Sequence, residues 1–216
     1  MAFDALDEHE QSEEVRKWIR DNAMSIVIGI ALGLLLIFGW QQWRTHRARH
    51  QAQAASEYQA FSTAIAAKNV ELGKTSLEHI QKDFSDTAYA VLASLQEGAA
   101  ALERKDLTGA ETALSWAYDH AQGDSLKSLA GQRLVRLRLA QEKMDDASNL
   151  LQKLPTTGFS ASIAELRGDV LLAQGHNDSA RGAYQEAIDA LDVSDPSRAD
   201  LEMKRDNAAN ATEQHS

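Results

Sequence analysis

The chain has 216 residues, a formal net charge of −10 and no cysteine, so disulfides, iron–sulfur clusters and thiolate zinc sites are excluded. Residues 51–216 carry sixteen basic and twenty-five acidic side chains, whereas nucleic-acid-binding domains usually present a basic surface. With only two prolines, the chain can form helix along most of its length. We therefore expect an all-α protein that binds no nucleic acid.

The first 43 residues combine an acidic segment with an apolar one. Residues 1–22 carry seven acidic and three basic side chains, and residues 22–43 carry none of either kind. As a helix, this uncharged run extends roughly 33 Å, close to the roughly 30 Å of a bilayer's hydrocarbon layer. The sequence therefore predicts an acidic tail over residues 1–22 and a transmembrane helix over residues 23–43. We expect the lipid bilayer to contact the anchoring side chains Ile26, Ile30, Leu34, Ile37, Trp40 and Trp43.

A cleaved signal peptide is the main alternative to a permanent anchor. The apolar run is longer than the roughly 7 to 15 residues of a signal core, and it is followed by arginines rather than by a small-residue cleavage site. These features favour a retained anchor. Three basic residues flank the span on each side, so the charge rule leaves its orientation open. Ser25, Gly29 and Gly33 share one helical face, which also leaves open whether the span self-associates.

The remaining chain shows helical periodicity and an internal repeat. Similar alanine-led patterns begin at Ala110, Ala147 and Ala180, and Gly98, Val135 and Gly168 stand twelve residues before them. A small residue at that phase lets paired helices approach closely, as in tetratricopeptide repeats. The sequence predicts a tetratricopeptide-like α-solenoid of antiparallel helix pairs over residues 44–216; a generic helical bundle is the alternative. We expect repeats at about 87–122, 124–155 and 158–192, with a closing helix at about 195–211.

No catalytic or metal-binding constellation is evident. The chain contains no phosphate-binding loop, no serine-hydrolase elbow and no paired-histidine zinc motif. His46 and His50 have ligand-like spacing, but they lie among three arginines whose charge opposes a divalent cation. We therefore expect no enzyme activity, no cofactor and no metal. An enzyme whose site is assembled only in the folded chain is the alternative.

A groove lined by the first helix of each repeat is the remaining candidate site, because these helices form the inner surface of such solenoids. Its predicted lining is apolar at one end and acidic at the other, which favours an apolar or amphipathic partner segment; packing of these leucines against the N-terminal helices is the alternative. The predicted groove residues are Leu92, Leu95, Ala99, Leu102, Leu129, Gln132, Arg136, Leu139, Glu165, Asp169 and Leu172.

The order of several short motifs resembles one family, the ancillary subunits of the bacterial SecYEG translocon, which combine a single span with tetratricopeptide-like repeats. The motifs are Glu14-Val15-Arg16-Lys17-Trp18-Ile19, Gly39-Trp40-x2-Trp43, Tyr89-x2-Leu92-Ala93-Ser94-Leu95 and Glu165-Leu166-Arg167-Gly168-Asp169.

This resemblance implies a non-catalytic protein of the bacterial inner membrane, with its N-terminus in the cytoplasm and its repeats in the periplasm beside SecYEG. It also implies a partnership with a membrane-anchored periplasmic chaperone of the peptidyl-prolyl isomerase type, which handles newly translocated proteins. A cytoplasmic response regulator of envelope stress is implied as a partner of the tail. Because equal numbers of basic residues flank the span on its two sides, a cytoplasm-facing tetratricopeptide adaptor or import receptor remains the alternative.

Overall fold

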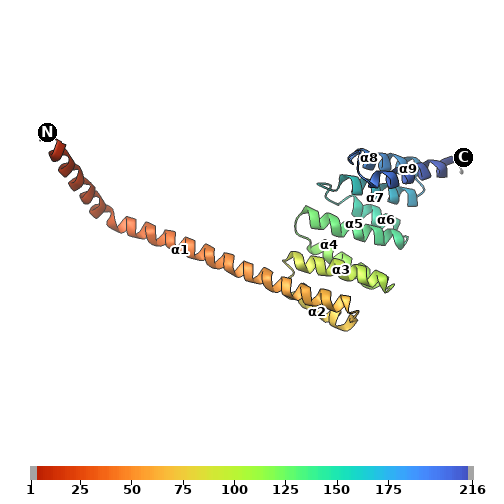
Figure 1. Cartoon of the computed structure of the whole chain (residues 1–216), viewed down its shortest axis with the longest axis horizontal. Helices are drawn as coiled ribbons and strands as arrows, with labels where there is room; N and C mark the ends of the chain where they lie inside the picture. The colour runs from red at the N-terminus through yellow and green to blue at the C-terminus, as the bar shows by residue number, and fades with distance from the viewer. Residues whose placement is uncertain (1–3, 214–216) are drawn as a thin grey trace. The chain divides into compact units, whose positions relative to one another are not determined.

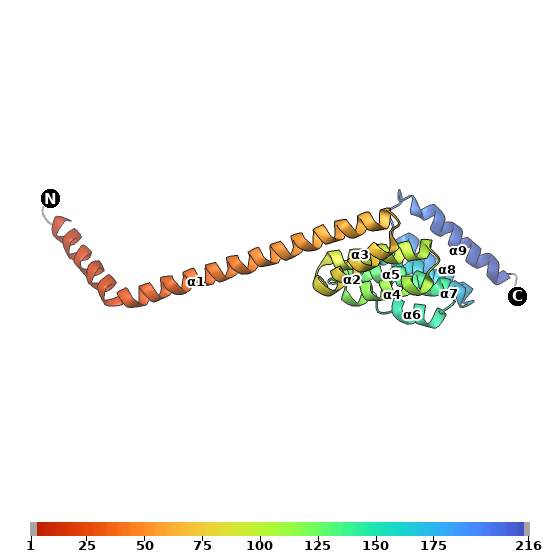
Figure 2. The same ribbon diagram turned by 90° about the horizontal axis from the view of Figure 1, so that it is seen from below.

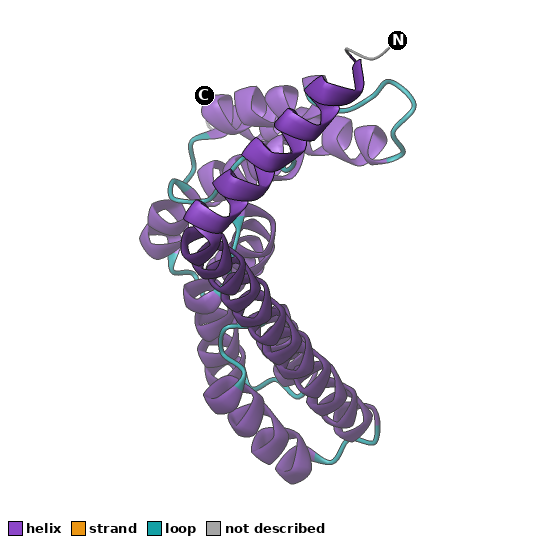
Figure 3. Ribbon diagram, turned by 90° about the vertical axis from the view of Figure 1, so that its left-hand side faces the viewer, coloured by secondary structure: helices purple, strands orange, loops and turns teal. Residues whose placement is uncertain are grey.

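The computed structural model describes the backbone of residues 4–213 and the side chains of residues 15–209. The described residues form nine helices and no strand, which confirms the predicted all-α class (Figure 3). The chain divides into two units, residues 1–52 and residues 53–216. Residues 1–3 of the predicted acidic tail lie outside the described residues.

Helix α1 (Asp4–Ala66) belongs to both units. Its residues 4–52 form the helix of the first unit, and its residues 53–66 are part of the second unit. It is the one helix in the described part of the chain that is long and apolar enough to cross a membrane. None of its most apolar stretch is buried against protein, as expected for a span that faces lipid. The helix also includes the acidic segment from Asp4 onward, so the segment predicted as a separate tail continues directly into the span.

The second unit is a stack of helix pairs. Figure 1 shows these helices following one another in chain order, from yellow to blue, and Figure 2 shows the same helices from below. Their bounds are α2 (Val70–Asp83), α3 (Ala88–Glu103), α4 (Leu107–His120), α5 (Asp124–Ala140), α6 (Met144–Leu151), α7 (Ser160–Ala173), α8 (Asn177–Asp189) and α9 (Ser197–Glu213).

The helices of this stack form two layers. Helix α5 contacts both α3 and α7 directly, whereas α4, α6 and α8 make no comparable contact with one another in the described structure. The first helices of successive pairs therefore lie closer to one another than the second helices do. We call α3, α5 and α7 the inner layer, and α4, α6 and α8 the outer layer.

Four turns repeat the same geometry. Lys68, Lys105, Glu142 and Gly175 have positive φ angles of 56°, 61°, 60° and 79°, at spacings of 37, 37 and 33 residues. In each turn this residue donates its N–H to the carbonyl three residues back, and the next residue donates to the carbonyl five residues back. This is the Schellman motif, which ends a helix by satisfying its last carbonyls. The end of α1 and α2 therefore form a first pair in phase with the later three.

Side-chain caps distinguish the early pairs from the later ones. Asn69 and Asp106 accept hydrogen bonds from the backbone N–H groups of Leu72 and Gly109, at 3.1 and 2.9 Å. The equivalent residues Lys143 and His176 form no side-chain cap. Helices α6 and α8 therefore begin with backbone N–H groups that the preceding side chain leaves uncapped.

Close helix approach occurs at glycine in the first and third full repeats. A Cβ atom on Gly98 would lie 2.6 Å from Leu114 Cδ2, and one on Gly168 would lie 2.5 Å from Tyr184 Cδ1. These positions are the small residues that the repeat alignment identified.

The middle repeat is different. Val135 is fully buried, and the glycine against a neighbouring helix is Gly131, one turn earlier. A Cβ on Gly131 would clash with Leu154 and lie 3.2 Å from the Tyr118 ring. Leu154 reaches this position because α6 ends at Leu151 and the following turn folds back.

The closing helix α9 packs on α8. Its buried apolar side chains are Leu201 and Ala208, which join a cluster containing Tyr184 and Ile188. Arg198 donates hydrogen bonds to the carbonyls of Ile188 and Leu191 at 2.7 and 3.2 Å. Helix α9 therefore covers the last repeat with few apolar side chains and several polar contacts.

Candidate functional site

The inner layer exposes one face of α3 and one face of α5, and the two faces match in register. On α3 the face contains Leu92, Gln96, Ala99 and Glu103; thirty-seven residues later, α5 places Leu129, Arg133, Arg136 and Ala140 at the same phase. These eight residues are exposed or half-buried. We call them the inner face.

The structure places the predicted groove residues of α3 and α5 in two environments. Ala99 and Arg136 are exposed, Leu102 is 41% exposed, and Leu92, Leu129 and Leu139 are half-buried. Leu95 and Gln132 are 2% and 5% exposed and pack inside the stack. Gln132 donates a hydrogen bond to Ser128 Oγ at 3.2 Å within its own helix. At these two levels their chain neighbours are more accessible: Arg133 is exposed, and Gln96 is half-buried and accepts a hydrogen bond from Ser62 Oγ at 2.8 Å.

The predicted anchor residues all lie on α1. Ile30, Leu34, Ile37, Trp40 and Trp43 have exposed side chains, and that of Ile26 is half-buried. The rings of Trp40 and Trp43 lie 5.2 Å apart, and the Arg47 guanidinium lies 5.5 Å from the Trp43 ring centroid. Aromatic and basic side chains in this combination are typical of a membrane interface.

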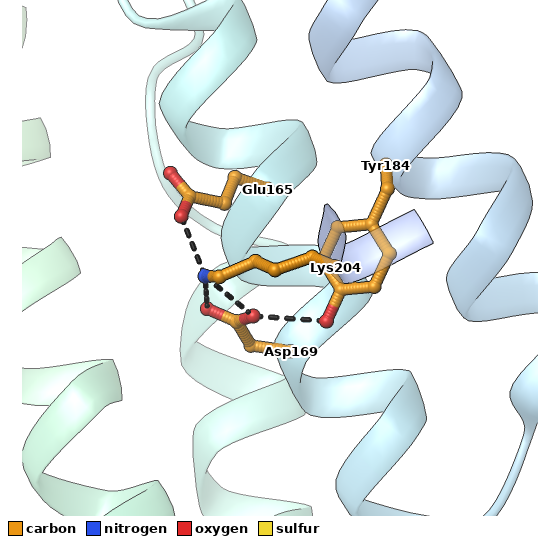
Figure 4. Close-up of polar contacts among 4 residues, drawn as sticks. All are labelled: Glu165, Asp169, Tyr184 and Lys204. Atoms are coloured by element: carbon orange, nitrogen blue, oxygen red, sulfur yellow. Dashed lines mark hydrogen bonds and ion pairs between the residues drawn. The ribbon is translucent and has the colours of Figure 1, made fainter. Parts of the chain in front are cut away.

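The acidic residues predicted for the far end of the groove are engaged by α9 (Figure 4). Lys204 Nζ lies 2.6 Å from Glu165 Oε1 and 3.0 Å from Asp169 Oδ1, and the Tyr184 hydroxyl donates to Asp169 Oδ1 at 2.9 Å. The side chains of Glu165 and Asp169 are only 25% and 27% exposed. Leu172, the last predicted groove residue, is half-buried on α7.

The pKa values of this cluster are shifted by its burial and its hydrogen bonds. Burial alone would lower the pKa of Lys204, but the hydrogen bonds to Glu165 and Asp169 outweigh that effect and raise it above its usual value. Burial and the charge of Asp169 raise the pKa of the Tyr184 hydroxyl. Lys204 therefore stays charged, and Tyr184 stays protonated, well into the alkaline range.

Two arginines of α5, Arg133 and Arg136, differ from most other arginines of the stack. Arg104 pairs with Glu97 at 2.6 Å, and Arg167 pairs with Glu186 at 2.7 Å. Arg133 and Arg136 form no hydrogen bond or ion pair with any side chain that the structure describes. The sequence analysis missed both Arg133 and Gln96, which stand thirty-seven residues apart and one position after the predicted Gln132 and Leu95.

The stack offers little for catalysis. Within residues 15–209, no group of three or more histidine, aspartate or glutamate side chains is arranged to hold a metal ion. The polar cluster around Lys204 joins α7, α8 and α9, and its Glu165 also lines an open pocket of about 300 Å³. The arrangement of the inner face instead suits the binding of another polypeptide.

This fold is that of a membrane-anchored helical-repeat protein. Residues 16–210 match the family model of the tetratricopeptide repeat-like domain, and the chain belongs to that family.

Curated relatives align with this chain over most of their own length. The chain is 29% identical to a protein of Haemophilus influenzae over 187 aligned residues. The aligned region covers 87% of this chain and 91% of the relative. The chain is 26% identical over 202 residues to a protein of Escherichia coli, covering 93% and 96%. A Neisseria gonorrhoeae protein is 27% identical over 167 residues, covering 73% and 79%. All three relatives are named ancillary SecYEG translocon subunit, which confirms the resemblance found from the sequence motifs.

Proposed function

We propose that this protein is an ancillary subunit of the Sec translocon, anchored in the inner membrane by α1, and that its repeats bind other proteins without catalysis. The name of the curated relatives supports the association with SecYEG, and the match to the Escherichia coli relative covers almost the whole of both chains. The observation that carries the binding role is the inner face, where the stack presents half-buried leucines beside two exposed arginines that form no ion pair with any described side chain.

The proposal includes an orientation and further partners. Residues 1–22 lie in the cytoplasm, residues 23–43 cross the inner membrane, and residues 44–216 lie in the periplasm. There the repeats link the translocon to a membrane-anchored chaperone of the peptidyl-prolyl isomerase type that receives newly translocated proteins. The acidic N-terminal segment contacts a cytoplasmic response regulator of envelope stress.

The proposed binding surface is the accessible part of the inner layer. Leu92, Ala99, Leu102, Leu129, Arg136 and Leu139 remain candidates from the predicted groove, and Arg133 and Gln96 are added to them. Glu165, Asp169 and Leu172 border this surface where α7 meets α9, and they contribute only what Lys204 leaves accessible.

Co-purification tests the association. The full chain, tagged after Ser216, is purified from membranes in a mild detergent, and SecY, SecE and SecG are quantified against a tagged single-span membrane protein of unrelated function. We expect all three channel subunits to be enriched with this chain. Their recovery at the level of the unrelated protein would contradict the proposal.

A reporter fusion tests the orientation separately. An enzyme that is active only in the periplasm, fused after Ser216, should be active, and a cytoplasm-only reporter at the same site should be inactive. The opposite pair of results would favour the cytoplasm-facing adaptor.

A further inference from the structure

The inner face has the opposite charge from the body of the protein. Residues 51–216 carry nine more acidic than basic side chains, but on the inner face Arg133 and Arg136 outnumber the single carboxylate, Glu103. The next carboxylates along the inner layer, Glu165 and Asp169, share the single ammonium of Lys204 and are only partly exposed. A partner segment at α5 therefore meets accessible positive charge.

The geometry of the two arginines suits carboxylates. Arg133 and Arg136 are three positions apart on α5, so their Cβ atoms lie about 5 to 6 Å apart on one helical face. Each guanidinium is exposed and has no partner among the described side chains. Arginine presents a planar fork of donors that matches a carboxylate in a bidentate pair, which a lysine does not.

Apolar side chains lie beside the arginines. Leu129 is one turn before Arg133 on α5, and the neighbouring helix α3 contributes Leu92 and Ala99 at equivalent positions. The two leucines are half-buried and Ala99 is exposed. A segment that places apolar side chains against α3 would therefore bring its adjacent polar side chains to the arginines of α5.

From this arrangement we propose that the inner face binds an acidic, amphipathic polypeptide segment of a partner protein. Two carboxylates of the segment pair with Arg133 and Arg136, while its apolar side chains pack on Leu92, Ala99 and Leu129. The inference rests on the proposed function in one respect, that the repeats bind a protein, and it adds the chemistry of the segment. A basic segment is repelled at this face and is attracted to acidic surface elsewhere on the body.

Synthetic peptides test the inference with the full chain in phosphatidylcholine nanodiscs. The first probe is a fluorescein-labelled amphipathic peptide of fourteen residues with leucine on one face and glutamate on the flanks. A second peptide has lysine in place of every glutamate. Binding is measured by fluorescence anisotropy against empty nanodiscs. We expect the glutamate peptide to bind more tightly than the lysine peptide, and its affinity to fall as salt rises, because exposed ion pairs are screened.

Two charge-reversal variants locate the site. The double variant R133E/R136E should bind the glutamate peptide about tenfold more weakly, which corresponds to about 1.4 kcal/mol, and should bind the lysine peptide more tightly than the wild type does. The control K74E/R181E makes the same change in net charge at exposed residues of α2 and α8, and should bind both peptides as the wild type does. Circular dichroism checks that each variant is folded. If R133E/R136E does not fold, R133Q/R136Q is used in its place.

Three outcomes would overturn the inference: no binding of the glutamate peptide by the wild type, unchanged binding of the glutamate peptide after the inner-face substitutions, or an equal loss of its binding in the control K74E/R181E. Co-purification of the wild type with SecYEG is scored independently. A chain that co-purifies with the channel but does not bind the glutamate peptide through the inner face refutes this inference and leaves the proposed function intact.

Discussion

Lys204 of the closing helix lies 2.6 Å from Glu165 of α7, thirty-nine positions earlier in the chain. This contact joins α9 to the inner layer, and Asp169 and Tyr184 extend it. Because α9 buries few apolar side chains, this polar cluster supplies a large share of what holds the helix in place. The single ammonium of Lys204 compensates one of the two carboxylate charges of Glu165 and Asp169.

Loss of the Lys204 ammonium should loosen α9. The substitution Lys204→Met keeps most of the length of the side chain but leaves two partly buried carboxylates without their cation. We expect the free energy of unfolding to fall by about 2 kcal/mol, between the values typical of exposed and of fully buried ion pairs. Urea-induced unfolding of the full chain in detergent, followed by far-UV circular dichroism, measures the change. Lys74→Met, at an exposed residue of α2, is the control and should have little effect.

The contribution of Lys204 should disappear at alkaline pH. Its pKa is raised above the ordinary value of 10.5, so the stabilisation is fully present below that pH and is lost as pH rises through the folded-state pKa. The difference in unfolding free energy between wild type and Lys204→Met should therefore be constant from about pH 7 to 10 and shrink above pH 10.5. A difference that grows with pH in this range would show that Lys204 is not stabilised in its charged form.

The close approach of α7 and α8 should make Gly168 intolerant of a methyl group. Gly168→Ala places a Cβ 2.5 Å from Cδ1 of the Tyr184 ring, and overpacking of this kind typically costs about 1 to 3 kcal/mol. Gly182→Ala on α8 meets no atom within 4 Å and should stabilise the protein by about 0.5 to 1 kcal/mol, because alanine is the better helix former. The midpoint of thermal unfolding measures both, and equal midpoints for the two variants would refute the predicted contact.

An N-terminal cap on α8 should stabilise the last repeat. His176 occupies the capping position without a side-chain hydrogen bond, whereas Asp106 caps α4 at the same phase. His176→Asp should raise the free energy of unfolding by about 1 kcal/mol, and Asp106→Ala should lower it by a similar amount. Hydrogen exchange of the first turn of each helix locates the effect, which should be confined to α8 and α4 respectively.

Much of the fold was predictable because the repeat is a regular spacing of residues along the sequence. The phase set by Ala110, Ala147 and Ala180 correctly placed Gly98 and Gly168 against the second helix of their pairs. It failed for the middle repeat, where Gly131 rather than Val135 provides the close approach. Leu154 packs against Gly131 because α6 ends at Leu151. The spacing of residues in the sequence does not predict where α6 ends or this tertiary contact.

The site was less predictable than the fold, because exposure depends on a difference of one residue in helical phase. Gln132 and Arg133 are neighbours in sequence, but the first is buried and the second is on the surface. The charge of the surface also depends on a distant contact. Glu165 and Asp169 gave the predicted groove an acidic end, and only the folded position of Lys204 shows that one of these two charges is compensated.

Site-specific photo-crosslinking in intact membranes tests most directly whether the inner face is the binding surface of a translocon subunit. A benzophenone amino acid is placed at Ala99 or Arg136 on the inner face, or at Arg181 on the outer layer as a control. Adducts are probed with antibodies against SecY, SecE, SecG and the membrane-anchored isomerase. We predict adducts with at least one of these proteins from both inner-face positions and none from position 181. Adducts from position 181 alone, or none from the inner face, would contradict the account.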